Sequence, residues 1–286
     1  MATSGKVDYH IHYFVDGCAS DEMTLPNIAA EAVRIGLEEI GILKHYSQEL
    51  PNKETKWVSW KRIIPKQFVD FLTDIRSFHS PAGLHILAGV ETELLNDQGK
   101  INIPQSDIDK LDFINLSVHW LPDLEFLHVD PILWPGEIGK ISPATAERWH
   151  IQIRKIGTET ILKNFVSAYV NAIKCNPKVR SLAHMFDGLF PLRQYEVPVD
   201  DLGEKEILKL MEPLMQICLD KHVLWELTPA PVKCDFVLKR ANEIGVHFSA
   251  TVDAHFLHSG WANLCDHNKA ESYIDSLGLT KGTTCI

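Results

Sequence analysis

The stretch VDYHIHYFVDG, residues 7–17, decides how the rest of the sequence is interpreted. Its first six residues, VDYHIH, form a short run of the kind that is typical of a buried strand. Residues two positions apart in a strand point to the same side, so His10 and His12 are predicted to face one spot together. Two such imidazoles are either two core histidines or half of a metal site, and the remaining sequence has to decide between them.

The composition is that of an ordinary globular protein, with 286 residues, 45% of them hydrophobic and 23% charged. No apolar run approaches the roughly 18 residues that span a membrane, and the N-terminal MATSGK leads directly into the first strand without a signal peptide. We therefore predict a cytoplasmic protein with no membrane partner. The net charge of −10 argues against binding of long nucleic acid, but permits a small anionic substrate if bound cations invert the local field.

Seven short apolar runs predict buried strands, over residues 7–12, 38–45, 83–94, 112–120, 179–186, 222–228 and 245–255. Helical patterns separate most of them, over residues 24–36, 66–78, 146–175, 203–221 and 231–245. Strands that alternate with helices predict a parallel sheet. Because no break in composition divides the seven units, we predict a single α/β domain over residues 1–286, built as a closed or nearly closed barrel. The irregular segment 121–144 is predicted to be a long loop that covers the site.

A histidine or carboxylate stands at the C-terminal end of six of these seven runs: His10 and His12, His45, Glu91, His119, His184, and Asp253 with His255. Barrels of this class build their active sites at that rim. Imidazole and carboxylate ligands together suit zinc, iron or manganese. With Asp16 they make nine candidate ligands, enough for two or three divalent ions. A single histidine in an apolar run is more often a core residue, but that explanation would have to hold at six strand ends independently.

The order of these motifs resembles the PHP superfamily (polymerase and histidinol phosphatase), and within it the histidinol-phosphatase-like branch. The motifs read DYHIH, GVE, SVH, LAHMFD and VDAH, and the resemblance extends from Asp8 to about Gly260. Each motif is weak by itself, but five in this order are specific. The resemblance implies a distorted, TIM-like (β/α)7 barrel with a trinuclear metal centre that hydrolyses phosphate esters.

The resemblance also implies roles for individual residues. Carried over by position, one metal is held by His10, His12, Glu91 and Asp253, a second by Glu91, His119 and His184, and a third by Asp16, His45 and His255. The implied phosphate-binding arginine is matched best by Arg193, with Arg148 as a weaker candidate. Glu226 and His258 are secondary candidates for substrate binding, Glu226 also for supporting a ligand.

Two positions depart from the family pattern. The family usually has an acidic residue before the second-strand histidine, and this chain has Lys44 there. Lys44 either points away into solvent or faces the site, where it contributes to catalysis by engaging an anionic substrate group. Tyr13 replaces the usual Thr or Ser after the histidine pair, and the step to Asp16 looks one residue short, so Cys18 and Asp21 are alternatives to Asp16 as a ligand.

The leading hypothesis is a metal-dependent phosphatase that hydrolyses a small, histidinol-phosphate-like phosphomonoester with a metal-activated hydroxide. In it, Glu91 and Asp253 hold the metals, and Arg193 with Lys44 binds the phosphate. One alternative is a phosphodiesterase acting on a cyclic or short nucleotide. A second is a metal-dependent enzyme with other chemistry, amidohydrolase-like or redox, and a third is a metal-binding barrel without enzymatic activity. The sequence leaves the oligomeric state open.

Overall fold

The computed structural model describes residues 6–16, 18–46, 65–117, 143–229 and 234–283. Seven strands form one parallel sheet in sequence order: β1 (Val7–His12), β2 (Glu39–Tyr46), β3 (His85–Glu93), β4 (Phe113–Ser117), β5 (Val179–Leu182), β6 (Leu224–Leu227) and β7 (Phe248–Ala250). The segment after β7 returns to β1, where Ala254 N donates to His10 O and His12 N donates to Ala254 O, both at 2.9 Å. The prediction of a nearly closed, distorted (β/α)7 barrel is confirmed.

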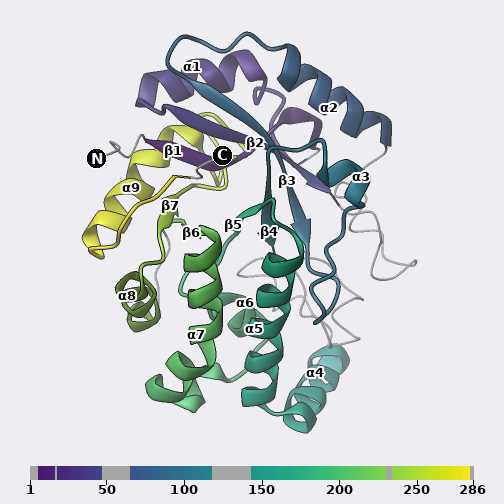
Figure 1. The fold of residues 1–286 in the computed structure, drawn as a ribbon, viewed down its shortest axis with the longest axis vertical. Helices are drawn as coiled ribbons and strands as arrows, with labels where there is room; N and C mark the ends of the chain where they lie inside the picture. The colour runs from purple at the N-terminus through teal and green to yellow at the C-terminus, as the bar shows by residue number, and fades with distance from the viewer. Residues whose placement is uncertain (1–5, 17, 47–64, 118–142, 230–233, 284–286) are drawn as a thin grey trace.

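Helices surround the sheet on its outer side, as Figure 1 shows. They are α1 (Leu25–Ile35), α2 (Pro65–Ser77), α3 (Gln105–Ile108), α4 (Pro143–Ile156), α5 (Thr158–Cys175), α6 (Phe190–Gln194), α7 (Glu204–Lys221), α8 (Asp235–Ile244) and α9 (His267–Ser276), with short 3₁₀ turns η1 (Phe14–Asp16), η4 (Val199–Leu202) and η5 (Leu264–Asp266). Helix α1 begins and ends as predicted, with a proline in its first turn and Gly36 at φ 82° after its last residue. Only glycine adopts that left-handed conformation without steric cost.

The prediction of one continuous helix over residues 146–175 is wrong. Gly157 has φ 87°, outside the helical region, and it separates α4 from α5. A change of direction at this point lets α5 pack beside α7 in the outer layer (Figure 1). Of the loop predicted over residues 121–144, residues 121–142 lie outside the described residues, and so does the candidate ligand His119, whereas residues 143 and 144 begin α4.

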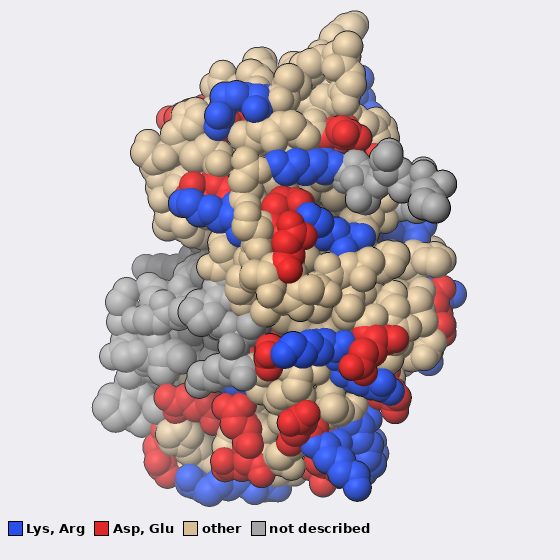
Figure 2. Space-filling view, turned by 90° about the vertical axis from the view of Figure 1, so that its left-hand side faces the viewer, with Lys and Arg blue, Asp and Glu red and all other residues tan. Residues whose placement is uncertain are grey.

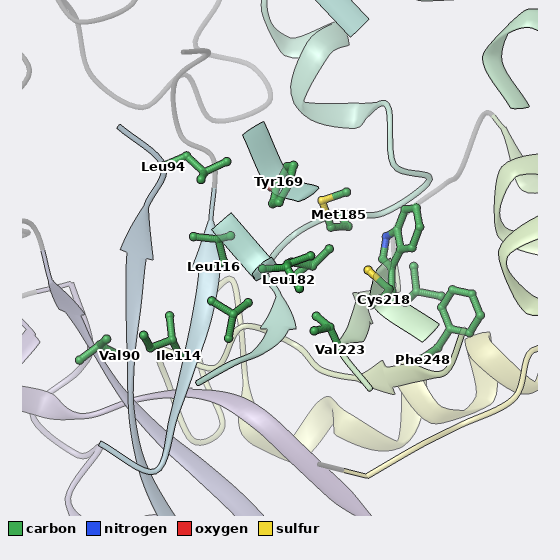
Figure 3. Packing of buried hydrophobic residues seen from close by; sticks show 14 of the residues in the cluster. Val90, Leu94, Ile114, Leu116, Tyr169, Leu182, Met185, Cys218, Val223 and Phe248 are labelled. Carbon is green, nitrogen blue, oxygen red and sulfur yellow. The ribbon is translucent and has the colours of Figure 1, made fainter. Parts of the chain in front are cut away.

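The large hydrophobic core lies between the sheet and the helices. Figure 3 shows Val90, Ile114 and Leu182, from β3, β4 and β5, in one cluster with Tyr169 of α5 and Cys218 of α7. Burial of this apolar surface is the main stabilising term of the fold. It also fixes which face of each strand points to the helices, and therefore which side chains are left to fill the barrel interior.

A smaller core closes the barrel interior below the polar rim. It consists of Val7, Tyr9, Leu43, Leu87, Phe113 and Leu224. The Phe113 ring lies over two glycines, and a Cβ added at Gly41 or Gly89 would lie 2.4 Å from that ring. The close approach explains glycine at both positions, since any side chain there would displace the ring. This apolar layer is the floor on which the polar residues of the rim stand.

The surface carries charges of both signs. On the face shown in Figure 2, acidic and basic side chains are interspersed and do not form a field of one sign. Among the helices that the structure describes, none has the length and apolar character needed to cross a membrane. The predicted cytoplasmic location, the exclusion of nucleic acid and the assignment of residues 1–286 to one domain stay predictions.

Candidate metal centre

The structure brings the eight described candidate ligands together at the carboxyl ends of the strands. Seven of them are buried: His10, His12, Asp16, His45, Glu91, Asp253 and His255, while the side chain of His184 is 15% exposed. Five separate parts of the chain contribute to this cluster: β1 with the η1 turn that follows it, β2, β3, and the segments after β5 and β7. Three groups of its ligand atoms lie within 4.8 Å of one another: His10, His12 and Asp253; His10, Glu91 and His184; and His12, Asp16, Cys18 and His45.

The two histidines of β1 converge as their spacing predicted. His10 Nε2 and His12 Nε2 lie 3.1 Å apart. Asp253 Oδ1 lies 3.0 Å from the first nitrogen and 3.2 Å from the second, and Glu91 Oε2 lies 3.6 and 3.5 Å from them. Two imidazole nitrogens and two carboxylates therefore face one small volume between β1, β3 and the segment after β7.

The opposite nitrogen of His10 is held by Glu226, on β6. Glu226 Oε2 lies 2.8 Å from His10 Nδ1, and Glu226 Oε1 accepts hydrogen bonds from Asn115 Nδ2 at 2.6 Å and Ser181 Oγ at 2.8 Å. Asn115 and Ser181 were not predicted from the sequence, although the period of two along β4 and β5 places both on the inner face. Glu226 thus positions a candidate ligand from behind.

Asp16 holds His12 and His45 in the same way. Its Oδ2 lies 2.7 Å from His12 Nδ1 and 2.5 Å from His45 Nδ1, and the His45 backbone N–H also donates to this carboxylate. Burial opposes the charged form of Asp16, but His45, His12 and Lys44 together bring the pKa of its carboxyl well below the usual range. A permanently ionised carboxylate is suited to fixing the orientation of two imidazole rings.

Glu226 and Asp16 determine which ring nitrogens of His10 and His12 can bind a metal. When Nδ1–H of His10 donates to Glu226 and Nδ1–H of His12 donates to Asp16, both Nε2 atoms carry lone pairs. Two lone pairs 3.1 Å apart repel each other, and a cation between them removes the repulsion. Asp253 Oδ1, buried beside both nitrogens, accepts no hydrogen bond from the described residues. The donor set of imidazoles and carboxylates therefore fits a divalent metal.

Without a metal, protons on the histidines offset part of the negative charge of the surrounding carboxylates. Burial alone would lower the pKa of His10, but Asp253 and Glu226 raise it well above its ordinary value. His255 behaves in the opposite way, because burial and the neighbouring His12 lower its pKa to about 3. Since ligand atoms must lose their protons, metal binding at this cluster is coupled to proton release.

The remaining candidate ligands complete the rim. His45 Nε2 lies 2.8 Å from Glu91 Oε2, and His184 Nε2 lies 3.3 Å from Asp253 Oδ2 and 3.7 Å from Glu91 Oε1. The ring of His255 stacks on that of His12 with centroids 4.1 Å apart. Glu91 therefore has histidines from three different segments within 4 Å, which is the arrangement expected of a bridging carboxylate.

Three of these residues do not lie on strands, contrary to the prediction. β5 ends at Leu182 and β7 at Ala250, so His184, Asp253 and His255 stand in the segments that follow, and His184 and Asp253 have φ 49° and φ 52°. Left-handed backbone is costly for residues with a side chain, and it clusters at functional sites. These turns, rather than the strands, aim the two side chains at Glu91 and His10.

The candidate substrate residues are less closely tied to the cluster. Arg193, on α6, is half-buried and donates to Asp187 and to Asp200, so a phosphate would compete with two carboxylates for it. Arg148 is exposed on α4. The side chain of His258 is 56% exposed, and its Nδ1 lies 3.9 Å from Glu31 Oε1. The substrate roles of these residues stay predictions.

The two positions that depart from the family pattern are both explained by packing. Tyr13 points to α2, where its hydroxyl donates to Asp74 at 2.9 Å. The side chain of Lys44 is 2% exposed, so its interpretation as a solvated residue is wrong. Its Nζ donates to Asp16 Oδ1 at 3.2 Å and lies 3.4 Å from Val15 O.

A further buried pair, Asp8 and His267, was not predicted from the sequence. His267 is fully buried at the start of α9, with its Nδ1 3.0 Å from Asp8 Oδ2. The other oxygen of Asp8 accepts the backbone N–H of His10 at 3.0 Å. The first acid of the DYHIH motif thus supports the strand that carries the two histidines and anchors α9 to it. Only the tertiary fold brings residues 8 and 267 together.

Comparison with known proteins agrees with this fold. Over 99% of the chain, the structure superposes on 97% of a histidinol phosphate phosphatase from Lactococcus lactis, solved with zinc, L-histidinol and phosphate, with a TM-score of 0.56 and 18% identity. The fold is that of histidinol phosphate phosphatases. A putative histidinol phosphatase from Listeria monocytogenes gives the same TM-score with 13% identity, over 87% of this chain and 95% of that one. The predicted resemblance is confirmed at the level of the fold.

Sequence comparison finds distant relatives that are named as phosphatases. A probable phosphatase from Caldicellulosiruptor saccharolyticus is 23% identical over 251 residues, which are 88% of this chain and 80% of that protein. A probable phosphatase from Vibrio campbellii is 25% identical over 265 residues, covering 88% and 78%. No family model matches the chain.

Proposed function

We propose that this protein is a metal-dependent phosphatase that hydrolyses a small phosphomonoester. The observation that carries the proposal is the convergence of His10, His12, Glu91 and Asp253 at the carboxyl rim of the barrel. The fold, and relatives named as phosphatases, support it. Histidinol phosphate is the substrate we propose to test first, because the superposed Lactococcus lactis enzyme was solved with L-histidinol and phosphate.

The proposed division of labour follows from the contacts. His10, His12, Glu91, His184 and Asp253 would hold divalent ions. Bound there, such ions lower the pKa of water toward neutrality and stabilise negative charge on a phosphoryl group. Glu226 and Asp16 keep the Nδ1 protons of the histidine ligands in place, so that the Nε2 atoms stay available. The apolar floor formed by Tyr9, Leu43 and Phe113 closes the site from below.

The proposal is tested on the full chain loaded separately with zinc, manganese and iron. Metal content is measured by plasma mass spectrometry, and phosphate release is measured with histidinol phosphate, other small phosphomonoesters and cyclic or linear phosphodiesters. Phosphate release from a monoester that depends on the metal is expected. Preference for diesters would favour the phosphodiesterase alternative. A fully metal-loaded protein that is inactive on both panels would refute the proposal in favour of different chemistry or a purely binding role.

Glu91→Gln provides the matched variant. Gln keeps the shape of the side chain but removes the negative charge that four histidines approach within 4 Å. We expect loss of both bound metal and phosphate release. An exposed acid treated in the same way, Glu243→Gln on α8, should leave both unchanged. Full metal content together with full activity in Glu91→Gln would exclude Glu91 as the bridging ligand.

A further inference from the structure

Lys44 is an unusual residue to find beside a metal centre. Its side chain is among the largest that are fully buried in the described protein, at 1% relative exposure for the residue. Burial of an ammonium group is costly unless a counter-charge is close. The counter-charge here is Asp16, whose Oδ1 lies 3.2 Å from Lys44 Nζ. Lys44 is therefore held in place by its ion pair with this one carboxylate.

The strand geometry explains how the lysine reaches Asp16 without entering the barrel. Leu43 belongs to the interior floor and His45 to the rim, so alternation along β2 puts Lys44 on the opposite face. Asp16 lies between the two faces. Its Oδ2 faces the rings of His12 and His45 on one side, and its Oδ1 receives the ammonium on the other.

The contact with Lys44 distinguishes the ligand group around Asp16 from the other two groups of the cluster. The group of His12, Asp16, Cys18 and His45 has the donor types and spacing of a metal site. Yet the oxygens of Asp16 already accept bonds from two imidazoles, one backbone N–H and one ammonium. A metal ion bound to Asp16 would have to share the negative charge of this carboxylate with Lys44. It would also be repelled by the buried Lys44 ammonium close to it. In the group of His10, His12 and Asp253, the carboxylate is paired with histidines, whereas Asp16 is also paired with Lys44.

We propose that the Lys44 ammonium takes the place of a third metal ion, so that the centre binds two divalent ions instead of three. Lys44 then orients Asp16 through the ion pair, and Asp16 acts on His12 and His45 as a positioning residue rather than as a ligand. The inference concerns the same site as the proposed function, but it rests on the Lys44–Asp16 contact and not on the reaction.

The test is a count of bound metal. The purified full chain is saturated with zinc, desalted and analysed by plasma mass spectrometry, together with Lys44→Met and, as a control, Lys239→Met on the exposed face of α8. Methionine matches the length of lysine but carries no charge. We expect two ions per chain in the wild type and in Lys239→Met, and three in Lys44→Met, with the added ion bound by Asp16 and His45.

Three ions in the wild type would overturn the proposal, and so would a count in folded Lys44→Met that stays at two. If Lys44→Met does not fold, anomalous scattering at the zinc edge from wild-type crystals decides the matter: a metal peak beside Asp16 refutes the proposal, and its absence with two peaks elsewhere supports it. The count is independent of hydrolysis. Two ions in a protein that releases no phosphate would refute the proposed function alone, whereas three ions in an active phosphatase would refute this inference alone.

Discussion

Replacing Glu226 by Gln tests whether the residues behind the metal ligands control metal binding. Glu226 accepts three hydrogen bonds, from His10 Nδ1, Asn115 Nδ2 and Ser181 Oγ. Gln keeps only one acceptor oxygen. If its amide NH₂ faces His10, the ring must accept at Nδ1 and carry its proton on Nε2, the atom that faces the metal position. If the NH₂ faces Asn115, two donors oppose each other in a buried site.

Both orientations of the Gln amide predict weaker metal binding and lower stability. Loss of an orienting carboxylate behind a histidine ligand lowers metal affinity by about 10–100-fold, which is about 1.4–2.8 kcal/mol of binding free energy. An unpaired buried donor costs about 1–3 kcal/mol of unfolding free energy. We therefore expect Glu226→Gln to fold with reduced stability and to bind zinc at least about 10-fold more weakly than the wild type.

Zinc affinity is measured by competition with a chromophoric chelator at neutral pH, and stability by urea unfolding of the metal-free protein. Glu243→Gln, at an exposed position of α8, controls for the change in net charge. A zinc affinity within about twofold of the wild type for folded Glu226→Gln would refute the reasoning, since it would mean that the tautomer of His10 does not depend on Glu226.

The other predictions concern the buried pair on α9, the interior floor and the bridging acid. Asp8, together with Glu271, raises the pKa of His267 to about 9 against the opposing effect of burial. This contribution is on the order of 3 kcal/mol, is complete below the unfolded pKa near 6.5 and is lost as pH rises through about 9. The difference in urea midpoint between wild type and His267→Gln should accordingly shrink over that range, and a constant difference would contradict it. Gly89→Ala should lower the unfolding free energy by about 1–3 kcal/mol, because its Cβ meets the Phe113 ring, and adding Phe113→Leu should restore part of the loss in the same assay. Glu91→Gln should abolish metal-dependent phosphate release, as measured by a colorimetric phosphate assay.

Much of the candidate centre could be predicted from the sequence, because its ligands stand at regular places. Alternating strand and helix patterns predict a parallel barrel, and the carboxyl ends of parallel strands meet at one rim. That rule alone predicts that His10, His12, His45 and Glu91 lie close together. The residues at which the strands end were predicted less well. His184 and Asp253 stand in left-handed turns beyond β5 and β7, and a pattern of apolar residues does not indicate such a turn.

The sequence by itself therefore determined the barrel, the rim and the residue types that face a metal. Only the tertiary structure decided what stands behind those residues. Glu226 behind His10, Asp16 behind His12, and Asp8 with His267 are contacts between residues whose roles depend on burial and on hydrogen-bond partners. The same holds for Lys44, because the sequence does not tell whether a lysine in a strand faces solvent, contacts a substrate or pairs with a buried carboxylate. The choice among them is made by the low polarity of the interior, where a charge persists only beside its counter-charge.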